Sequence, residues 1–501
     1  MPTKKVYTNT LAQIWWKVVT ALISIGLIKI LTNYLDVAGY GMYSKIYNYL
    51  SIFAVIADLG LYTITVREIS EHKEKPEMVR KIVWNVLTLR TGLWGIIIFL
   101  SLAIALFLPG YNSPTALLAI LITSIFTCFW LINSSIMSLL QAYLKTEFSF
   151  FSITLGKITT FLCVVAIVYL GYPHTTMMQD ETSRLIGFNL IMLAWLIGNM
   201  VMTGLTYMYA RNIEQIRFRF DWSYVKHILV LSLPYGIALF LNVIFFKVDV
   251  ILLSLLESGA MADISIALYA LPMKIVEVGM MYGTLFLNSM LPLLTMAITK
   301  NDTKEKKRLT EKALFILSFF GIGMAFFLYT YASEVIHILA SKAYFENAFS
   351  SYTSEDAMQI VTWIFLFYFL SSLFTYILIA ANEQRKMMYI NAWIALFNII
   401  GNILVIPHYS FIGSAYVTVI SQILLLICTI LGSRHIIRVS IFTEKTLFLL
   451  WFAFLATYIS QYIQNINDYG IYGNIIIGIG IFSLLYGSLP GVFFLIEKKR
   501  K

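Results

Sequence analysis

The apolar run ILVLSLPYGIALFLNVIFFKVDVILLSLL, residues 228–256, decides the fold class. It is longer than the roughly 20 residues that cross the hydrocarbon core of a bilayer, so it predicts a membrane-spanning helix. Lys247 and Asp249 interrupt it, and each charge requires a wet cavity or a partner, because hydrocarbon burial costs at least about 2.5 kcal/mol. Residues two apart on a helix point about 200° apart, so the two side chains should face different surfaces. Pro234 and Gly236 predict a bend in this helix, and interrupted, charged spans are typical of transporters.

The rest of the chain repeats this apolar pattern. Of its 501 residues, 59% are hydrophobic and only 12% are charged, and the mean hydropathy is +0.80. These values exclude a soluble globular protein and predict an all-α polytopic membrane protein with fourteen spans. The expected spans are 11–34, 44–66, 84–108, 115–140, 150–171, 186–209, 228–256, 266–297, 313–333, 358–381, 388–406, 411–431, 446–463 and 470–495.

The connections between these spans alternate in charge. Lys and Arg gather in 67–81, 211–226, 300–312 and 434–445 and in the tail EKKRK, whereas the intervening breaks, 36–44, 109–115, 256–265, 407–411 and 465–472, contain neither residue. By the positive-inside rule, both termini are expected in the cytoplasm of a multi-pass inner (plasma) membrane protein. The net charge of +10 is therefore assigned to topology and to contact with anionic lipid headgroups, and no nucleic-acid partner is expected.

A basic linker, 211–227, divides the chain. We expect an N-terminal lobe over 1–210 and a C-terminal lobe over 211–432, each with six spans and the same orientation, followed by two additional spans and a basic tail over 433–501. Both lobes begin with a span that carries a Lys toward its outer end, followed by a Gly-containing acidic turn. This pattern predicts two pseudo-symmetric lobes related by an axis along the membrane normal.

Eight charged residues are embedded in the spans and are the candidate functional residues. The basic ones, expected to line a cationic cavity, are Lys29, Arg90, Lys157, Lys247 and Lys274, and the acidic ones, expected to couple transport or to be structural, are Asp58, Asp249 and Glu277. Two alternatives stay open from the residues alone. Asp58 either pairs with a Lys from another helix or titrates during transport, and Lys274 either faces the cavity or pairs with Glu277 three residues later.

Other chemistry is missing from the sequence. It has no P-loop, no GxGxxG that follows a strand, no HExxH motif and no paired-Cys motif, and its three Cys residues lie within spans without metal-ligand spacing. All six His residues lie in breaks or at span ends, so carboxylates are the candidates for any proton coupling. No cofactor, no metal site and no enzymatic activity are expected.

Two segments resemble a known family. They are NYLDVAGYGMYSKIYNYLSIFAVIADLGLYTITVREIS (33–70) and FKVDVILLSLLESGAMADISIALYALPMKIVE (246–277), which are similar to loose motifs of the polysaccharide transporters, the Wzx-type flippases of the multidrug/oligosaccharidyl-lipid/polysaccharide (MOP) exporter superfamily. The resemblance implies two six-helix lobes that alternate between inward-open and outward-open states around a central cavity. It also implies outward transport of a polyprenyl-pyrophosphate-linked oligosaccharide, such as an O-antigen, capsule or exopolysaccharide repeat unit. The implied partners are the bilayer, a coupling ion (H⁺ or Na⁺), and the polymerase and glycosyltransferases of the same pathway.

The embedded charges agree with this substrate, because Lys side chains in a wet cavity attract a pyrophosphate. Two alternatives share the fold. A MATE-like multidrug exporter would transport cationic drugs and would require an acidic cavity, whereas the embedded charges here are mostly basic. A lipid II flippase of the MurJ type would also have fourteen spans and a cationic cavity, and the extra pair of spans favours it slightly.

Overall fold

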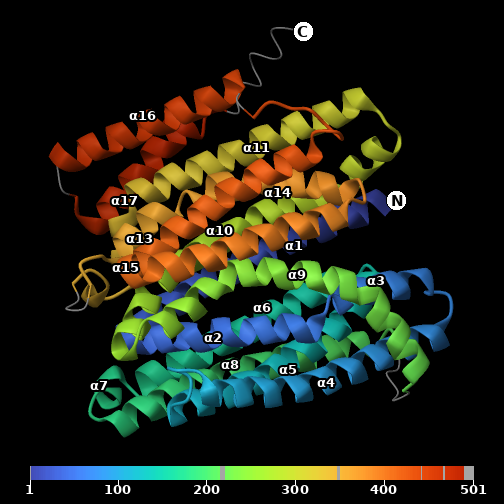
Figure 1. Cartoon of the computed structure of the whole chain (residues 1–501), viewed down its shortest axis with the longest axis horizontal. Coiled ribbons are helices and arrows are strands. Elements are labelled where there is room, and N and C mark those ends of the chain that lie inside the picture. Colours follow the sequence, from blue (N-terminus) through green and yellow to red (C-terminus); the bar gives the residue numbers. More distant parts are fainter. Residues whose placement is uncertain (1, 215–219, 347–349, 442, 467–468, 490–501) are drawn as a thin grey trace. The chain divides into compact units, whose positions relative to one another are not determined.

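The computed structural model describes residues 2–214, 220–346, 350–441, 443–466 and 469–489, with side chains from Trp15 onward except at positions 234, 235, 238 and 242 (Figure 1). The described chain is helical, with no strand, which confirms the all-α fold class. Two compact units, Met1–Ile266 and Ala267–Lys501, divide it. The expected boundary between lobes at 211–227 is defined by a repeat of six spans. A division into compact units does not test that repeat, so the two lobes stay a prediction.

The first unit contains nine helices that run mostly the length of a membrane span. They are α1 (Pro2–Tyr34), α2 (Asp36–Asp58), α3 (Leu61–Glu71), α4 (Pro76–Phe107), α5 (Pro114–Ala142), α6 (Thr146–Ala166, extended by a π-turn over Ile167–Gly171), the short α7 (His174–Met177), α8 (Glu181–Ala210) and α9 (Trp222–Leu256). Within this unit α8 packs on both α5 and α6, α1 packs on α6, and α2 packs on α9.

The second unit begins within α10 (Gly259–Thr299), which starts in the first unit. Its remaining elements are α11 (Thr303–Thr330), α12 (Ala332–Leu339), a 3₁₀ turn (Lys342–Tyr344), α13 (Ser354–Val361), α14 (Ile364–Ala380), α15 (Gln384–Ser433), α16 (Glu444–Ile466), α17 (Gly470–Ile481) and a π-turn (Phe482–Tyr486). The last two spans pack on α11, where the rings of Tyr486 and Phe319 stack with centroids 4.9 Å apart.

The described helices account for the expected crossings. Twelve are long and apolar enough to cross a membrane, and the shorter apolar segment Gly470–Tyr486 follows them. Helix α15 has 50 residues, about 75 Å of helix, which is too long for one crossing of a core about 30 Å thick. It changes direction at Ser410, whose φ of 51° and ψ of −143° are not helical, and the Asn398 amide donates back to Ser421. Helix α15 is therefore two crossings with a break inside the expected connection 407–411, which gives fourteen crossing segments.

Helix α9 continues from Trp222 to Leu256 without an interruption, and a bend within it near Pro234 and Gly236 stays a prediction. The side chain of Pro234 lies outside the described residues. The second span is interrupted instead, because α2 ends at Asp58 and the backbone is left-handed at Leu59 (φ 43°) and Gly60 (φ 70°) before α3 begins. Gly236 serves close packing against this break, since a Cβ there would lie 2.7 Å from the Leu59 carbonyl.

Candidate functional site

A cavity of about 550 Å³ lies within the first unit, between α2, α3, α5, α6 and α8. Its wall carries two charged side chains, Asp58 and Lys157, and the amides of Asn133 and Asn199. The remaining wall is largely aromatic and apolar and includes Tyr47, Tyr62, Phe126, Trp130, Met137 and Trp195. An apolar, aromatic wall with a few placed polar groups is the usual composition of a small-molecule binding site.

The close crossing of α6 and α8 places two of the polar side chains on this wall. A Cβ on Gly198 would lie 2.7 Å from the Gly156 carbonyl oxygen, so the two helices approach each other closer than side chains permit. Lys157 and Asn199 each follow one of these glycines and line the cavity. Small residues at the crossing therefore bring a cation and an amide to the same cavity from separate helices.

Lys157 forms its hydrogen bond with the neighbouring helix. Its Nζ donates to Ser24 Oγ of α1 at 2.8 Å, while the residue lines the cavity. The Asn199 amide donates to the Trp195 carbonyl at 2.9 Å, which orients its oxygen. Lys157 is therefore a cation anchored at the wall by a neutral hydroxyl.

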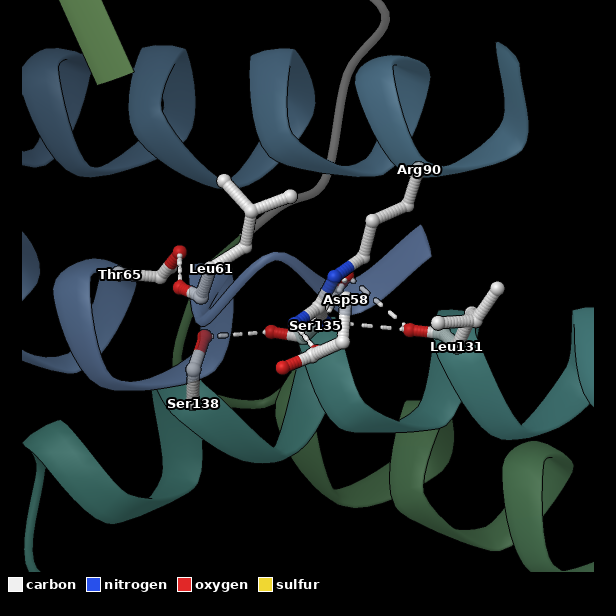
Figure 2. Close-up of polar contacts among 7 residues, drawn as sticks. All are labelled: Asp58, Leu61, Thr65, Arg90, Leu131, Ser135 and Ser138. Atoms are coloured by element: carbon white, nitrogen blue, oxygen red, sulfur yellow. Dashed lines mark hydrogen bonds and ion pairs between the residues drawn. The ribbon is translucent and has the colours of Figure 1, made fainter. Parts of the chain in front are cut away.

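Asp58 is held at the wall by a buried ion pair (Figure 2). Arg90 reaches from α4 with 0% of its side chain exposed, and its Nη2 donates to Asp58 Oδ1 at the end of α2. Its Nη1 donates to Ser135 Oγ at 2.7 Å and to the Leu131 carbonyl of α5 at 3.3 Å. Because buried charges in a membrane require a partner, this network neutralises both groups and joins three helices.

Arg90 consequently differs from the expectation that it lines the cavity. Its guanidinium is fully buried among α2, α4 and α5, and only its partner Asp58, with 13% of its side chain exposed, reaches the wall. Of the two open readings of Asp58, the structure shows pairing with a cation from another helix, although the cation is Arg90 and not a Lys.

Lys247 contacts Tyr47, one of the residues that line the cavity. Its Nζ is 6.0 Å from the centre of the Tyr47 ring, and that ring lines the cavity. Asp249, two residues later, is completely buried, whereas Lys247 is partly exposed. The two side chains therefore occupy different environments, as their angular separation on the helix predicts.

The other three predicted residues are not among those that line this cavity. Lys29 of α1 is exposed, and Lys274 of α10 donates to Glu277 Oε2 at 3.0 Å. This ion pair between Lys274 and Glu277 is the one that their three-residue spacing predicts, and both residues belong to the second unit. Whether Lys29, Lys247 and Lys274 border one central cavity stays a prediction.

The family assignment follows from the sequence match. A family model described as "Polysaccharide biosynthesis protein" matches residues 6–298, which is more than half of the chain, and a second model, MatE, matches residues 234–404. The chain belongs to the polysaccharide biosynthesis protein family. No curated protein matches the sequence.

Solved structures support the same fold for this family member. One described as "Lipid II flippase MurJ, inward closed conformation" superposes with a TM-score of 0.75 at 18% identity and covers 98% of this chain and 100% of that chain. An inward-facing multidrug resistance MATE family transporter of the MOP superfamily gives a TM-score of 0.66 at 13% identity over 85% of this chain and 98% of that one. A MOP superfamily transporter from Pyrococcus furiosus gives 0.60 at 12% identity over 85% and 95%. The family match and the shared fold agree with the resemblance to the polysaccharide transporters, and the twelve membrane-length apolar helices of the described residues indicate a multi-pass membrane protein.

Sequence reasoning missed the aromatic and amide lining of the cavity in this family member. Trp130 and Trp195 lie near the middle of α5 and α8, whereas tryptophans that anchor a span prefer the membrane interfaces. Asn133 and Asn199 follow them by three and four residues, about one helical turn. A tryptophan in mid-span with an amide one turn away was the available signal for a binding wall.

Proposed function

We propose that this protein is a flippase that moves a polyprenyl-pyrophosphate-linked oligosaccharide from the inner to the outer leaflet of the cell membrane. The observation that carries the proposal is the composition of the 550 Å³ cavity, where Lys157 lies on one wall with Trp130, Trp195 and the amide of Asn199. Tryptophan faces pack against sugar rings, amides hydrogen-bond hydroxyl groups, and an ammonium attracts phosphate. All three features suit a glycan joined to a pyrophosphate.

The charge of the cavity favours an anionic substrate over a cationic one. Asp58 is the one carboxylate among the described lining residues, and it is already paired with Arg90. Lys157 is the basic side chain on the wall, and Lys247 lies next to Tyr47, so cations outnumber carboxylates at and beside the cavity. A cationic drug would meet net repulsion here, so this charge balance supports a flippase over a MATE-like drug exporter.

The glycan, the coupling ion and the pathway partners belong to the same proposal. An O-antigen, capsule or exopolysaccharide repeat unit suits the aromatic wall, and the polymerase and glycosyltransferases of its pathway would supply and consume it. Asp58, Asp249 and Glu277 are the proposed coupling or structural carboxylates for H⁺ or Na⁺. The proposed location is the inner membrane with both termini in the cytoplasm.

A transport assay tests the role of Lys157. Proteoliposomes would carry a fluorescent polyprenyl-pyrophosphate oligosaccharide, and its loss from the inner leaflet would be followed for the wild type, Lys157→Ala and Lys157→Arg. We expect Lys157→Ala to lower the rate at least about tenfold while Lys157→Arg keeps part of it, because the charge is retained. Lys312→Ala, an exposed lysine of α11, is the matched control and should transport like the wild type. Wild-type rates for Lys157→Ala would refute the assignment of this cavity.

A deletion strain separates the three transporter classes. We expect cells without the protein to accumulate a polyprenyl-linked surface glycan that faces the cytoplasm. Accumulation of lipid II instead would favour a MurJ-type function, and a normal surface glycan with altered drug resistance would favour an exporter.

A further inference from the structure

A second cavity, of about 560 Å³, lies in the second unit at the end of α15. Arg434 and Arg438 line it together with four apolar residues, Phe374 of α14, Ile430 of α15, and Ile437 and Val439 of the following segment. The positive-inside rule assigns this end of the helices to the cytoplasm. We call this cavity the arginine pocket.

The two arginines have no acidic partner among the described residues. Both side chains are exposed, and neither forms an ion pair within that part of the chain. The neighbouring acid, Glu383, is occupied by His435 and by Lys386, whose Nζ lies 3.6 Å from its carboxylate. The pocket therefore presents two uncompensated positive charges beside an apolar wall.

The end of α15 does not cancel this charge. A helix C-terminus carries a partial negative charge on its last carbonyls, which would disfavour an anion. Here Lys386 Nζ donates to the Gly432 carbonyl at 2.6 Å, so a cation already offsets one of those carbonyls. The arginines beyond Ser433 remain available for an external anion.

An apolar stripe leads along α15 to the arginine pocket. Tyr416, Ile420, Ile427 and Leu431 are 45–55% exposed and share one face of the helix, since they are spaced by four, seven and four residues. Arg434 continues the same face one turn after Ile430 and Leu431. An apolar face toward lipid chains is ordinary for a membrane helix, but a pair of unpaired arginines at its cytoplasmic end adds a place for one phosphate.

We propose that the arginine pocket binds an anionic phospholipid of the cytoplasmic leaflet. The phosphate lies between Arg434 and Arg438, whose planar guanidinium groups suit phosphate oxygens, and an acyl chain packs on the apolar wall and along the stripe of α15. None of its lining residues lines the cavity of the first unit. The inference depends on the proposed orientation but not on which substrate the protein transports.

Native mass spectrometry of the full-length protein in detergent tests the proposal. The probes are phosphatidylglycerol and, as a neutral lipid of the same acyl length, phosphatidylcholine. The variants are Arg434→Gln/Arg438→Gln and a matched control, Lys304→Gln/Lys312→Gln, which removes the same charge from exposed lysines of α11. We expect the arginine variant to lose one tightly bound phosphatidylglycerol, with affinity about 30-fold weaker, while the control binds like the wild type. Elution of both variants as monodisperse species checks that they fold.

Three results would overturn the proposal. The first is equal phosphatidylglycerol binding by the arginine variant and the control. The second is equal retention of phosphatidylcholine by the wild type, which would mean that the arginines select nothing. The third is displacement by inorganic phosphate or by a polyprenyl phosphate at lower concentration than by phosphatidylglycerol, which would assign the pocket to a free anion or to the transported lipid. Transport activity is not the readout, so a failure of the proposed flippase function would leave this result interpretable.

Discussion

Two of the ion pairs within the described spans differ in how far apart their partners are in the chain. Asp58 and Arg90 are 32 residues apart on α2 and α4, and 13% and 0% of their side chains are exposed. Lys274 and Glu277 are three residues apart on α10, and 36% and 26% of their side chains are exposed. The first pair joins separate helices beside a cavity, whereas the second neutralises two charges on one helix.

The difference shows that an embedded charge does not identify a transport site by itself. The Lys274–Glu277 pair forms wherever α10 is helical, because residues three apart are neighbours on a helix. The Asp58–Arg90 pair forms only when α2, α4 and α5 are packed, and it fixes Asp58 at the cavity wall. Loss of the Asp58–Arg90 pair should therefore alter the fold of the first unit, whereas loss of the Lys274–Glu277 pair should have a local effect.

Arg90→Gln should give the largest effect. It removes a fully buried cation and leaves Asp58 charged without its partner, for which a loss of about 3–5 kcal/mol is typical. Thermal unfolding of the purified protein, followed by tryptophan fluorescence or light scattering, should show a clearly lower midpoint. Arg67→Gln, an exposed arginine of α3, is the control. An unchanged midpoint for Arg90→Gln would mean that the network does not hold the three helices together.

Asp58→Asn should have an intermediate effect on stability. The amide oxygen still accepts from Arg90, whose bonds to Ser135 and Leu131 remain, so we expect a loss of about 1–3 kcal/mol. The variant also leaves a positive charge uncompensated next to the cavity, so binding of the anionic substrate should be retained or tightened. A titration with labelled lipid-linked oligosaccharide measures this, and markedly weaker binding by a folded variant would indicate that Asp58 contacts the substrate directly.

Lys274→Gln should give the smallest effect. The pair is local and about one-third exposed, so its loss should change stability by no more than about 0.5 kcal/mol. The same thermal assay applies, with Glu277→Gln as the complementary variant. If Lys274→Gln abolished transport while unfolding like the wild type, Lys274 would act on substrate and the contrast between the two pairs would fail.

The local features could be predicted from the sequence because they depend on periodicity. The apolar runs gave the crossings, including the break at Ser410 inside α15, and spacing predicted both the Lys274–Glu277 contact and the separate environments of Lys247 and Asp249. The length of an apolar run and the spacing of charges along it are fixed by the sequence alone, whichever helices pack against each other.

The cavity could not be predicted in this way because it depends on contacts between distant segments. Burial of Arg90 against Asp58 requires three helices to pack, so counting depth along one helix could not separate Arg90 from Lys157. Trp130 and Trp195 were hidden for a related reason, since aromatic residues are frequent in every span and only the packed α5 and α8 show which ones share a wall.

The contact between Gly236 and Leu59 has a mechanical consequence. A methyl group at position 236 would meet the Leu59 carbonyl at 2.7 Å, so α9 bears directly on the left-handed joint that separates α2 from α3. Lys247 lies eleven residues, about three turns, farther along α9, and Asp58 lies immediately before the left-handed residues Leu59 and Gly60. If the proposed anionic substrate binds near Lys247, we expect a rotation or slide of α9 to displace the left-handed segment between α2 and α3 and, with it, Asp58.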